Sequence, residues 1–281
     1  MNHKKLKKIK HLKKLQKTHS AGYIEQLQRF KKIFEPFSAI TFLINQILIS
    51  DKAIQQQELP NALPYLQLPD DIQQVIFEQI NQKYPLGNPK GDQLWNKYNN
   101  LLPKLDHLLR SYRDYLEETY GMWAYISKPF INDLAKYLDH ESTLEIMAGN
   151  GVISAGLRKY HENIIATDSL EWINENETGK HLWTDVKKMD ALTAIEQFGS
   201  QVKYVIMSWS PDGVPIDMKV LEKLRTLNPQ PILICIGEQN GATNSHEFWQ
   251  NAQMVDAKNT EKLNSHHQSF DLINEKVFLM K

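Results

Sequence analysis

The chain contains a single cysteine, Cys235, among its 281 residues. One cysteine excludes an intramolecular disulfide framework, and this scarcity suits a reducing compartment. A long apolar run is also missing, because the longest stretch, residues 37–49, is interrupted and falls short of the roughly 20 residues of a membrane span. The N-terminus lacks the apolar segment and cleavage site of a secretory signal. We therefore expect a cytoplasmic protein without a membrane span.

Net charge is zero, because 33 Lys and Arg residues balance 33 Asp and Glu residues. The charge is segregated, however, since residues 1–32 hold eleven basic residues and one acid. Within residues 4–17, Leu6, Ile9, Leu12 and Leu15 recur at three-residue steps among eight lysines, which predicts an amphipathic helix with a basic face. Such a face binds nucleic acid or another acidic surface, or is only solvated, as most charge runs are.

Helical periodicity dominates the first part of the chain. A break is expected at Pro36, and three prolines within residues 59–69 forbid a continuous helix there. Asp71 and its neighbour are suited to cap a following helix with apolar residues on one face. A further helical period runs from Leu94 to Glu118. We therefore predict an all-helical domain over residues 1–119.

The pattern changes after Gly121, where short apolar runs alternate with helical segments. These runs cover residues 143–147, 164–167, 204–208, 232–237 and 276–280. Their alternation with helices predicts a mostly parallel, doubly wound sheet that is covered on both faces. The last run follows residues 270–275 without room for a crossover helix, so we expect the sheet to end in an antiparallel strand pair. This second domain is predicted over residues 120–281.

Ligands bind such sheets beyond the carboxyl ends of the strands. The first predicted strand ends in Gly149-Asn150-Gly151, where glycines allow a sharp turn and a helix follows with its N–H groups free for a ligand. Asp168 ends the second strand, where an acid can accept from ribose hydroxyls, and Asp190 precedes the next helix. Each feature alone also fits a structural turn or a helix cap. Together they form a pattern typical of nucleotide-binding sites.

Residues 143–212 resemble the cofactor half of class I S-adenosylmethionine-dependent methyltransferases. The family's first loop reads acid-x-Gly-x-Gly-x-Gly, and this sequence has Glu145, Gly149 and Gly151 but Met147 at the first glycine position. The resemblance implies that Asp168 binds the cofactor ribose and that Asp190 accepts from the adenine amine. It extends over roughly residues 120–281. The implied cofactor-binding residues are Glu145, Met147, Gly149, Asn150, Gly151, Asp168, Ser169, Asp190, Ala191 and Ser208.

The fourth predicted strand ends in Ser208-Trp209-Ser210-Pro211-Asp212-Gly213. This segment is similar to the Asn/Asp/Ser-Pro-Pro-aromatic motif of amino-group methyltransferases, with one proline replaced and the aromatic residue moved forward. The resemblance implies that Ser208, Trp209 and Pro211 face the methyl acceptor, which would be an amine. The alternative is an apolar lid over the cofactor, for which Trp209 and Pro211 suffice.

Other residues invite weaker hypotheses. Glu238 or His246 could serve as a base near the substrate, although a histidine in an exposed cap region is more often inert. His266 and His267 would face opposite ways on a strand, and no spacing of Cys and His suggests a zinc site, so no metal is expected. Cys235 lies within an apolar run and is expected in the core.

Three functional hypotheses follow from these observations. The first is an active S-adenosylmethionine-dependent methyltransferase whose helical part helps to choose the acceptor. The second is a binding module that keeps the cofactor but has lost catalysis, motivated by Met147 and the altered loop after Ser208. The third is an NAD-dependent oxidoreductase, which fits less well because Ser154 stands where helix packing favours a third glycine. The sequence leaves the acceptor and the oligomeric state open.

Overall fold

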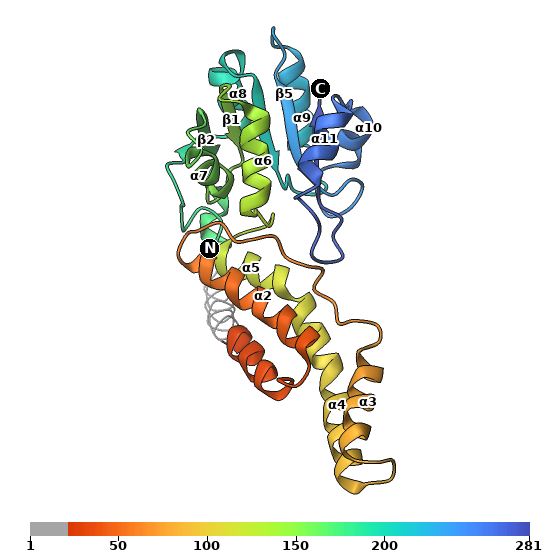
Figure 1. Cartoon of the computed structure of the whole chain (residues 1–281). Coiled ribbons are helices and arrows are strands. Elements are labelled where there is room, and N and C mark those ends of the chain that lie inside the picture. Colours follow the sequence, from red (N-terminus) through yellow and green to blue (C-terminus); the bar gives the residue numbers. More distant parts are fainter. Residues whose placement is uncertain (1–21) are drawn as a thin grey trace. The chain divides into compact units, whose positions relative to one another are not determined.

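A computed structural model describes residues 22–281 (Figure 1). The chain forms two compact units. The described part of the first comprises residues 22–52 and 63–118, and the second comprises residues 53–62 and 119–281. The boundary between residues 118 and 119 lies one residue before the predicted boundary between the two domains. The sequence pattern does not predict that residues 53–62 belong to the second unit. The basic segment 4–17 lies outside the described residues.

The first unit consists of helices and connecting loops, with no strand among its described residues. Helix covers residues 22–33, and the labelled helices are α2 Ser38–Gln55, α3 Ile72–Lys83, α4 Pro89–Arg110 and α5 Tyr112–Tyr120. The predicted break at Pro36 is confirmed, because residues 34–36 form a turn. Asp71 occupies the cap position of α3, but its side chain makes no capping hydrogen bond. Among residues 22–281, no helix is long and apolar enough to cross a membrane.

The prediction of one continuous helix over residues 94–118 is wrong. α4 begins earlier, where Asn88 caps it by accepting a backbone N–H at 3.0 Å. α4 and α5 are separated at Ser111, whose hydroxyl donates to the carbonyl oxygen of His107 at 2.7 Å. Local side-chain bonds of this kind compete with the helical ladder and favour a bend.

An aromatic cluster joins the helix 22–33 to α5 inside the first unit, and Asp51 of α2 is bonded to it. The ring centroids of Tyr23 and Tyr115 lie 4.5 Å apart, and those of Tyr112 and Tyr115 lie 6.0 Å apart. The Tyr115 hydroxyl donates to the buried carboxylate of Asp51 at 2.8 Å. Burial, together with the nearby Asp51 charge, raises the pKa of Tyr23 well above its usual value. Stacked rings and a shared carboxylate therefore fix these helices to one another.

A six-stranded sheet forms the centre of the second unit. Its strands are β1 Thr143–Ile146, β2 Ile164–Asp168, β3 Lys187–Lys188, β4 Tyr204–Ser208, β5 Ile232–Gly237 and β6 Lys276–Met280. Their order across the sheet is β3-β2-β1-β4-β5-β6. All neighbouring strands are parallel except β5 and β6, which run antiparallel. The predicted mostly parallel sheet with an antiparallel end is confirmed.

Helices cover both faces of this sheet. They are α6 Lys128–Leu138, α7 Val152–Arg158, α8 Ala191–Phe198, α9 Ile216–Arg225, α10 His246–Asn251 and α11 Ala257–Asn264. Every second residue of β1, β4 and β5 joins one core with α8, α9 and α10, as strand alternation requires. On the opposite face α6 packs against α7 and α11. The architecture is therefore doubly wound, as predicted.

The packing of α7 explains why residues 53–62 belong to the second unit. A Cβ added to Gly156 of α7 would lie 2.9 Å from Leu59 Cδ1 and 3.1 Å from the side chain of Ile131 in α6. Only a residue without a side chain allows these groups to approach so closely. Leu59 is thus part of the packed surface around α7.

Residues 270–275 contain no strand, so they do not form the antiparallel pair with β6. The partner of β6 is β5, with Leu233 opposite Met280. On the other side of β6, the Asn264 amide accepts the Val277 N–H at 2.9 Å and donates to its carbonyl oxygen at 2.8 Å. A side chain thus satisfies backbone groups that an edge strand leaves unpaired.

Candidate functional site

The loop after β1 turns sharply at the carboxyl edge of the sheet. Met147, Gly149 and Gly151 have φ angles of 52°, 54° and 71°. The Gly149 N–H donates to one carboxylate oxygen of Asp168 at 2.8 Å, and the other oxygen accepts the Leu170 N–H at 2.7 Å. The acid that ends β2 is therefore bonded directly to the glycine turn that follows β1.

Met147 shows why the family motif has glycine at this position. Its φ of 52° lies in the left-handed region, where the backbone of any residue other than glycine is strained by roughly 1–2 kcal/mol. The half-buried Met147 side chain packs against the hydrophobic core shared by β1, α8 and α9. Core packing therefore helps to hold a methionine in a conformation that glycine adopts freely.

Glu145 is buried and bonded to the start of α7. One of its carboxylate oxygens accepts the Ser154 N–H at 3.0 Å and also the Ser154 hydroxyl. Burial raises the pKa of Glu145 to about 7, although the bonds from Ser154 and the charge of Arg158 act in the opposite direction. The described contacts of Glu145 thus hold a helix in place, and its predicted role toward the cofactor stays a prediction.

We expect the Glu145→Gln substitution to remove a pH-dependent loss of stability. The pKa of Glu145 is raised from 4.5 to about 7 in the folded chain, so between these values the folded chain holds a proton that the unfolded chain has released. Stability therefore falls as pH rises through this window, by about 1–3 kcal/mol. Urea unfolding at about pH 5 and pH 7.5 should show this fall for the unmodified chain and a smaller one for the variant. Equal falls would contradict the assignment.

Asn150 fixes part of the connection between β2 and β3, residues 176–183, which we call the strap. Its side-chain oxygen accepts two backbone N–H groups of the strap at 2.8 and 3.3 Å. Its side-chain nitrogen donates to the carbonyl oxygens of Tyr120 at 2.7 Å and Glu177 at 3.3 Å. Asn150 is only 3% exposed. This predicted cofactor ligand therefore joins three segments around the glycine turn.

The strap lies directly against the glycine turn and against residues 121–125. A Cβ at Gly149 would be 3.2 Å from Thr178 Cγ2, and a Cβ at Gly121 would be 2.6 Å from the Glu177 backbone. The Trp123 indole N–H donates to the Thr178 hydroxyl at 3.1 Å. Residues 121–125 thus pack on the strap.

Asp190 caps α8, the structural role that competed with cofactor binding. Its carboxylate accepts the N–H groups of Leu192 at 3.1 Å and Thr193 at 3.0 Å. The hydrogen bond from the Thr193 hydroxyl lowers the pKa of Asp190. Ala191 begins α8 in the core, and Ser169 is half-buried beside the acid that ends β2. Roles for these residues toward an adenine ring stay predictions.

The loop after β4 places an aromatic ring at the same edge. Ser208 ends β4, and Trp209 follows with a φ of 52°. The Trp209 backbone N–H donates to Ile236 of β5 at 2.9 Å, and Pro211 forms a bridge with Thr243. Two strand ends therefore hold this loop, and its contact with an acceptor stays a prediction.

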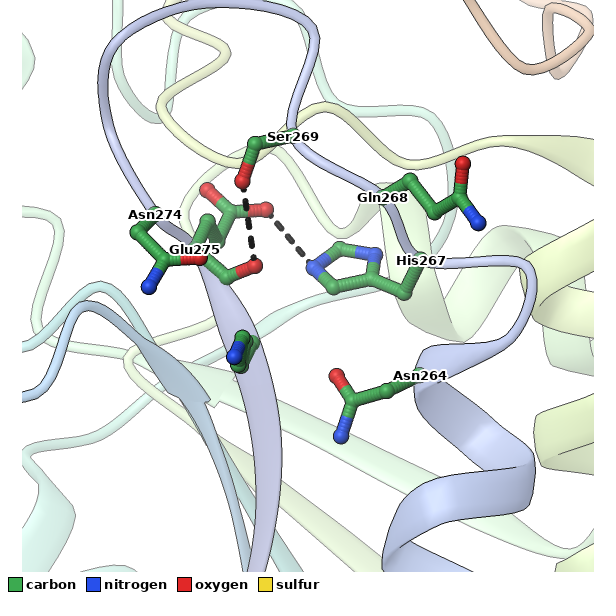
Figure 2. Close-up of a pocket in the computed structure, with 7 residues that line it drawn as sticks. Asn264, His267, Gln268, Ser269, Asn274 and Glu275 are labelled. Atoms are coloured by element: carbon green, nitrogen blue, oxygen red, sulfur yellow. Dashed lines mark hydrogen bonds and ion pairs between the residues drawn. The ribbon is translucent and has the colours of Figure 1, made fainter.

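Sequence reasoning missed Glu275 and the contact that it makes with His267, both of them buried beside this loop. Glu275 accepts the Trp209 indole N–H with one carboxylate oxygen, and its other oxygen lies 2.8 Å from Nε2 of His267. Figure 2 shows this contact at the wall of a pocket. The pocket has a volume of about 200 Å³. The pocket is lined by Asn264, His267, Gln268, Ser269, Asn274, Glu275 and Lys276. Only the clustering of polar residues before β6 could have indicated it.

The two predicted bases have structural partners. The Glu238 carboxylate accepts the Asn274 N–H at 2.8 Å and the Ala242 N–H at 2.8 Å, so it shapes the loop after β5. His246 begins α10, and its Nε2 lies 2.8 Å from the amide nitrogen of Gln250 on an exposed surface. Neither contact supplies evidence for acid–base catalysis.

The expectations for cysteine and histidine differ in outcome. Cys235 is fully buried, as predicted, and burial raises the pKa of its thiol. His266 and His267 lie in a loop and not on a strand, so the prediction of their strand geometry is wrong. The His266 ring instead lies 2.5 Å from the Asp133 carboxylate of α6. Within residues 22–281, no group of three or more His, Cys, Asp or Glu is arranged to hold a metal ion.

No protein-family model matches the chain, and no curated protein matches it in sequence. Solved structures with a likeness include the magnesium protoporphyrin IX methyltransferase of Synechocystis with bound S-adenosylmethionine, at 11% identity over 54% of this chain and 78% of that one, with a TM-score of 0.30. An O-methyltransferase family protein of Burkholderia thailandensis is 10% identical over 72% and 75%, with a TM-score of 0.33. Human N-acetylserotonin methyltransferase in complex with S-adenosylmethionine is 12% identical over 62% and 55%, also with a TM-score of 0.33. Because these TM-scores are below 0.5, the function proposed below rests on this chain's own residues.

Proposed function

We propose that the second unit is an S-adenosylmethionine-dependent methyltransferase domain. The observation that carries the proposal is the hydrogen bond from the Gly149 N–H to the Asp168 carboxylate. It places the acid suited to ribose hydroxyls beside bare glycine backbone at the carboxyl edge of a doubly wound sheet. Asp190, at the next helix start along the same edge, supports the proposal.

The residues at this edge fit a cationic cofactor. Each strand from β2 to β6 has an acid at or near the end that lies on this edge. In strand order these acids are Asp168, Asp190, Asp212, Glu238 and Glu275. Fixed negative charge on one edge favours positively charged ligands. Gly149 has a left-handed φ of 54°, and a Cβ there would lie 3.2 Å from Thr178 Cγ2, so a larger residue would be strained and tightly packed at this turn. Charge and backbone shape therefore both suit S-adenosylmethionine.

In the proposed reaction, the chain's residues act by binding and orientation. When bound, the cofactor supplies a methyl group on a positively charged sulfur. Asp168 holds its ribose, Asp190 accepts from its adenine amine, and Ser208, Trp209 and Pro211 orient the acceptor. Orientation and exclusion of water can supply most of the acceleration for such a transfer, so a catalytic acid–base pair is not required. The helical unit is proposed to help select the acceptor.

A thermal-shift measurement tests cofactor binding. S-adenosylhomocysteine at about 1 mM should raise the melting temperature by about 5–10 °C if its Kd is near 10 µM, because a ligand that binds only the folded state stabilises it. NAD at the same concentration should leave the melting temperature unchanged. A shift with NAD alone would favour the oxidoreductase hypothesis, and no shift with S-adenosylhomocysteine or S-adenosylmethionine would contradict the proposal.

A catalytically silent binding module is the second candidate. It is favoured by the strained Met147, which stands where the family's loop has its first glycine, and by the altered loop after Ser208. Methyl-labelled S-adenosylmethionine incubated with fractionated cell extract distinguishes the candidates. Transfer of label to one fraction, in proportion to the protein added, supports the enzyme. Binding of the cofactor with only slow, acceptor-independent loss of label supports the silent module.

A further inference from the structure

Two tryptophans from separate segments meet at the carboxyl edge of the sheet. The ring centroids of Trp123 and Trp209 lie 6.1 Å apart at an interplanar angle of 42°. Trp123 is 40% exposed and Trp209 is half-buried, so the pair presents aromatic surface at this edge. The φ of 52° at Trp209 is strained for a bulky residue. Such strain persists only where surrounding groups determine the conformation.

Glu275 supplies one of these determining groups. Its carboxylate accepts the Trp209 indole N–H and pairs with His267, and both members of the pair are less than 7% exposed. Figure 2 shows the Glu275 carboxylate directed toward the imidazole, while the Ser269 hydroxyl donates to the Glu275 carbonyl oxygen at 3.5 Å. A buried charge of this kind is costly unless its partners are in place. The Trp209 ring is therefore oriented by a fixed, shielded carboxylate.

This arrangement favours a positively charged ligand. Tryptophan faces attract cations more strongly than other aromatic faces do. An indole N–H that donates to a carboxylate is polarised, which raises the electron density of the ring. Residues 119–281 contain 21 Asp and Glu against 15 Lys and Arg, and at the edge described above the five acids outnumber Lys188, which ends β3, and Lys276, which begins β6. Ring polarity and local charge thus select for the same kind of ligand.

The loop also contains a hydrogen-bonding group that the protein itself does not use. The Ser210 hydroxyl, next to Trp209, is buried and has no hydrogen-bond partner within residues 22–281. Buried polar groups are nearly always satisfied, so an exception requires an explanation such as a ligand or water. This observation is independent of the ring geometry and of the charge.

We propose that Trp123, Trp209 and Glu275 form a subsite for an organic cation, the ammonium-bearing part of the methyl acceptor. The inference rests on the proposed methyltransferase function for its biological meaning. The aromatic faces contact the cation, while Glu275 acts as a positioning residue that orients Trp209. An acceptor that carries an amine follows from this reading, and an acceptor without one does not. If the bound ammonium nitrogen is itself the one methylated, it first releases its proton to solvent, and the neutral amine then displaces the sulfur of the cofactor.

Indole N–H signals in nitrogen-edited NMR spectra test the subsite on the full chain. Six tryptophans give six such signals, and Trp123→Phe and Trp209→Phe assign the relevant two. Choline is the cationic probe, and 3,3-dimethylbutan-1-ol is its neutral isostere. We expect choline to move the Trp123 and Trp209 signals in a saturable way and the neutral isostere to move neither. Equal responses to the two probes would overturn the proposal.

A substitution at Glu275 tests its positioning role. Glu275→Gln keeps an oxygen to accept the indole N–H but removes the charge, so choline affinity should weaken about threefold or more and the Trp209 signal should move upfield. Glu247→Gln, on the exposed part of α10, is the matched control and should change neither. Unchanged choline affinity in Glu275→Gln or in Trp209→Phe would contradict the proposal.

Separate titration with S-adenosylhomocysteine distinguishes this inference from the proposed function. Binding of S-adenosylhomocysteine without any selective response to choline would reject the cation subsite and leave the methyltransferase proposal standing. A selective response to choline without binding of S-adenosylhomocysteine would reject the methyltransferase proposal and, with it, the reading of the cation as a methyl acceptor.

Discussion

Asp168→Ala is expected to abolish the thermal shift produced by S-adenosylhomocysteine. The carboxylate is 6% exposed and accepts the N–H groups of Gly149 and Leu170, so alanine leaves both donors without their partner. Hydrogen bonds to a charged group contribute about 1.5–3 kcal/mol each. The two bonds together contribute about 3–6 kcal/mol, so the ligand-free variant should also melt about 8–18 °C lower. Loss of the glycine-turn geometry and loss of the ribose acceptor both lower the affinity for the cofactor.

Two controls separate loss of binding from loss of folding. Glu171→Ala removes an exposed acid three residues away and should preserve both the melting temperature and the ligand shift. Asp168→Asn retains one acceptor oxygen, so it should fold more stably than the alanine variant while binding S-adenosylhomocysteine much more weakly than the unmodified chain. Full affinity in a folded Asp168→Ala variant would reject the role assigned to this carboxylate.

Asn150→Ala is expected to destabilise the second unit and release the strap. The side chain makes four hydrogen bonds to backbone groups and is 3% exposed. Removing it leaves buried N–H and carbonyl groups unsatisfied, at a total of about 2–4 kcal/mol. The melting temperature should fall by about 5–12 °C. Amide hydrogen exchange should accelerate most at Gly179 and His181, whose N–H groups lose their acceptor.

Asn150→Asp tests whether hydrogen bonding or volume is responsible. Aspartate has nearly the same shape, but its oxygen would face the carbonyl oxygens of Tyr120 and Glu177, so this variant should melt at least as low as the alanine variant. Asn251→Ala, which removes one exposed hydrogen bond to Glu247, is the matched control and should melt within about 1 °C of the unmodified chain. An unchanged melting temperature in Asn150→Ala would contradict the role of Asn150 in joining the strap to the glycine turn.

The main strands could be predicted because each is a short apolar run buried on both faces. The predicted bounds of the last three agree with β4, β5 and β6, and those of the first two differ from β1 and β2 by one residue. β3 escaped prediction because it consists of Lys187 and Lys188, both exposed. Its pairing with Thr167 and Asp168 defines it as a strand, and no local pattern of residues in the sequence predicts that pairing.

Helix boundaries were less predictable where side chains compete with the backbone. The periodicity of apolar residues continues across Ser111, so the sequence favours one helix there. The chain nevertheless divides, and the Ser111 hydroxyl bonds back to His107. Similarly, Asp71 has the residue type of a cap but not the hydrogen bond of one. The residue type shows that a side chain can form a capping hydrogen bond, whereas the local geometry determines whether it does so.

At the candidate site, the strand-end residues were predictable and their partners were not. Gly149, Asp168 and Asp190 follow from the rule that ligands bind at the carboxyl edge. Glu275 and Trp209 are 66 residues apart in the sequence and meet only because β6 runs antiparallel beside β5. The amide of Asn150, likewise, is bonded to the strap 29 residues later. Such contacts depend on topology, which periodicity does not encode.

A calorimetric titration of the full chain with S-adenosylhomocysteine tests the central claim most directly. The glycine turn at Gly149 and the carboxylate of Asp168 predict binding of one molecule per chain with a Kd in the micromolar range, together with binding at least about 100-fold weaker in a folded Asp168→Asn variant. Absence of any binding heat up to about 1 mM across several temperatures, with the chain folded throughout, would contradict the claim that this edge is a cofactor site.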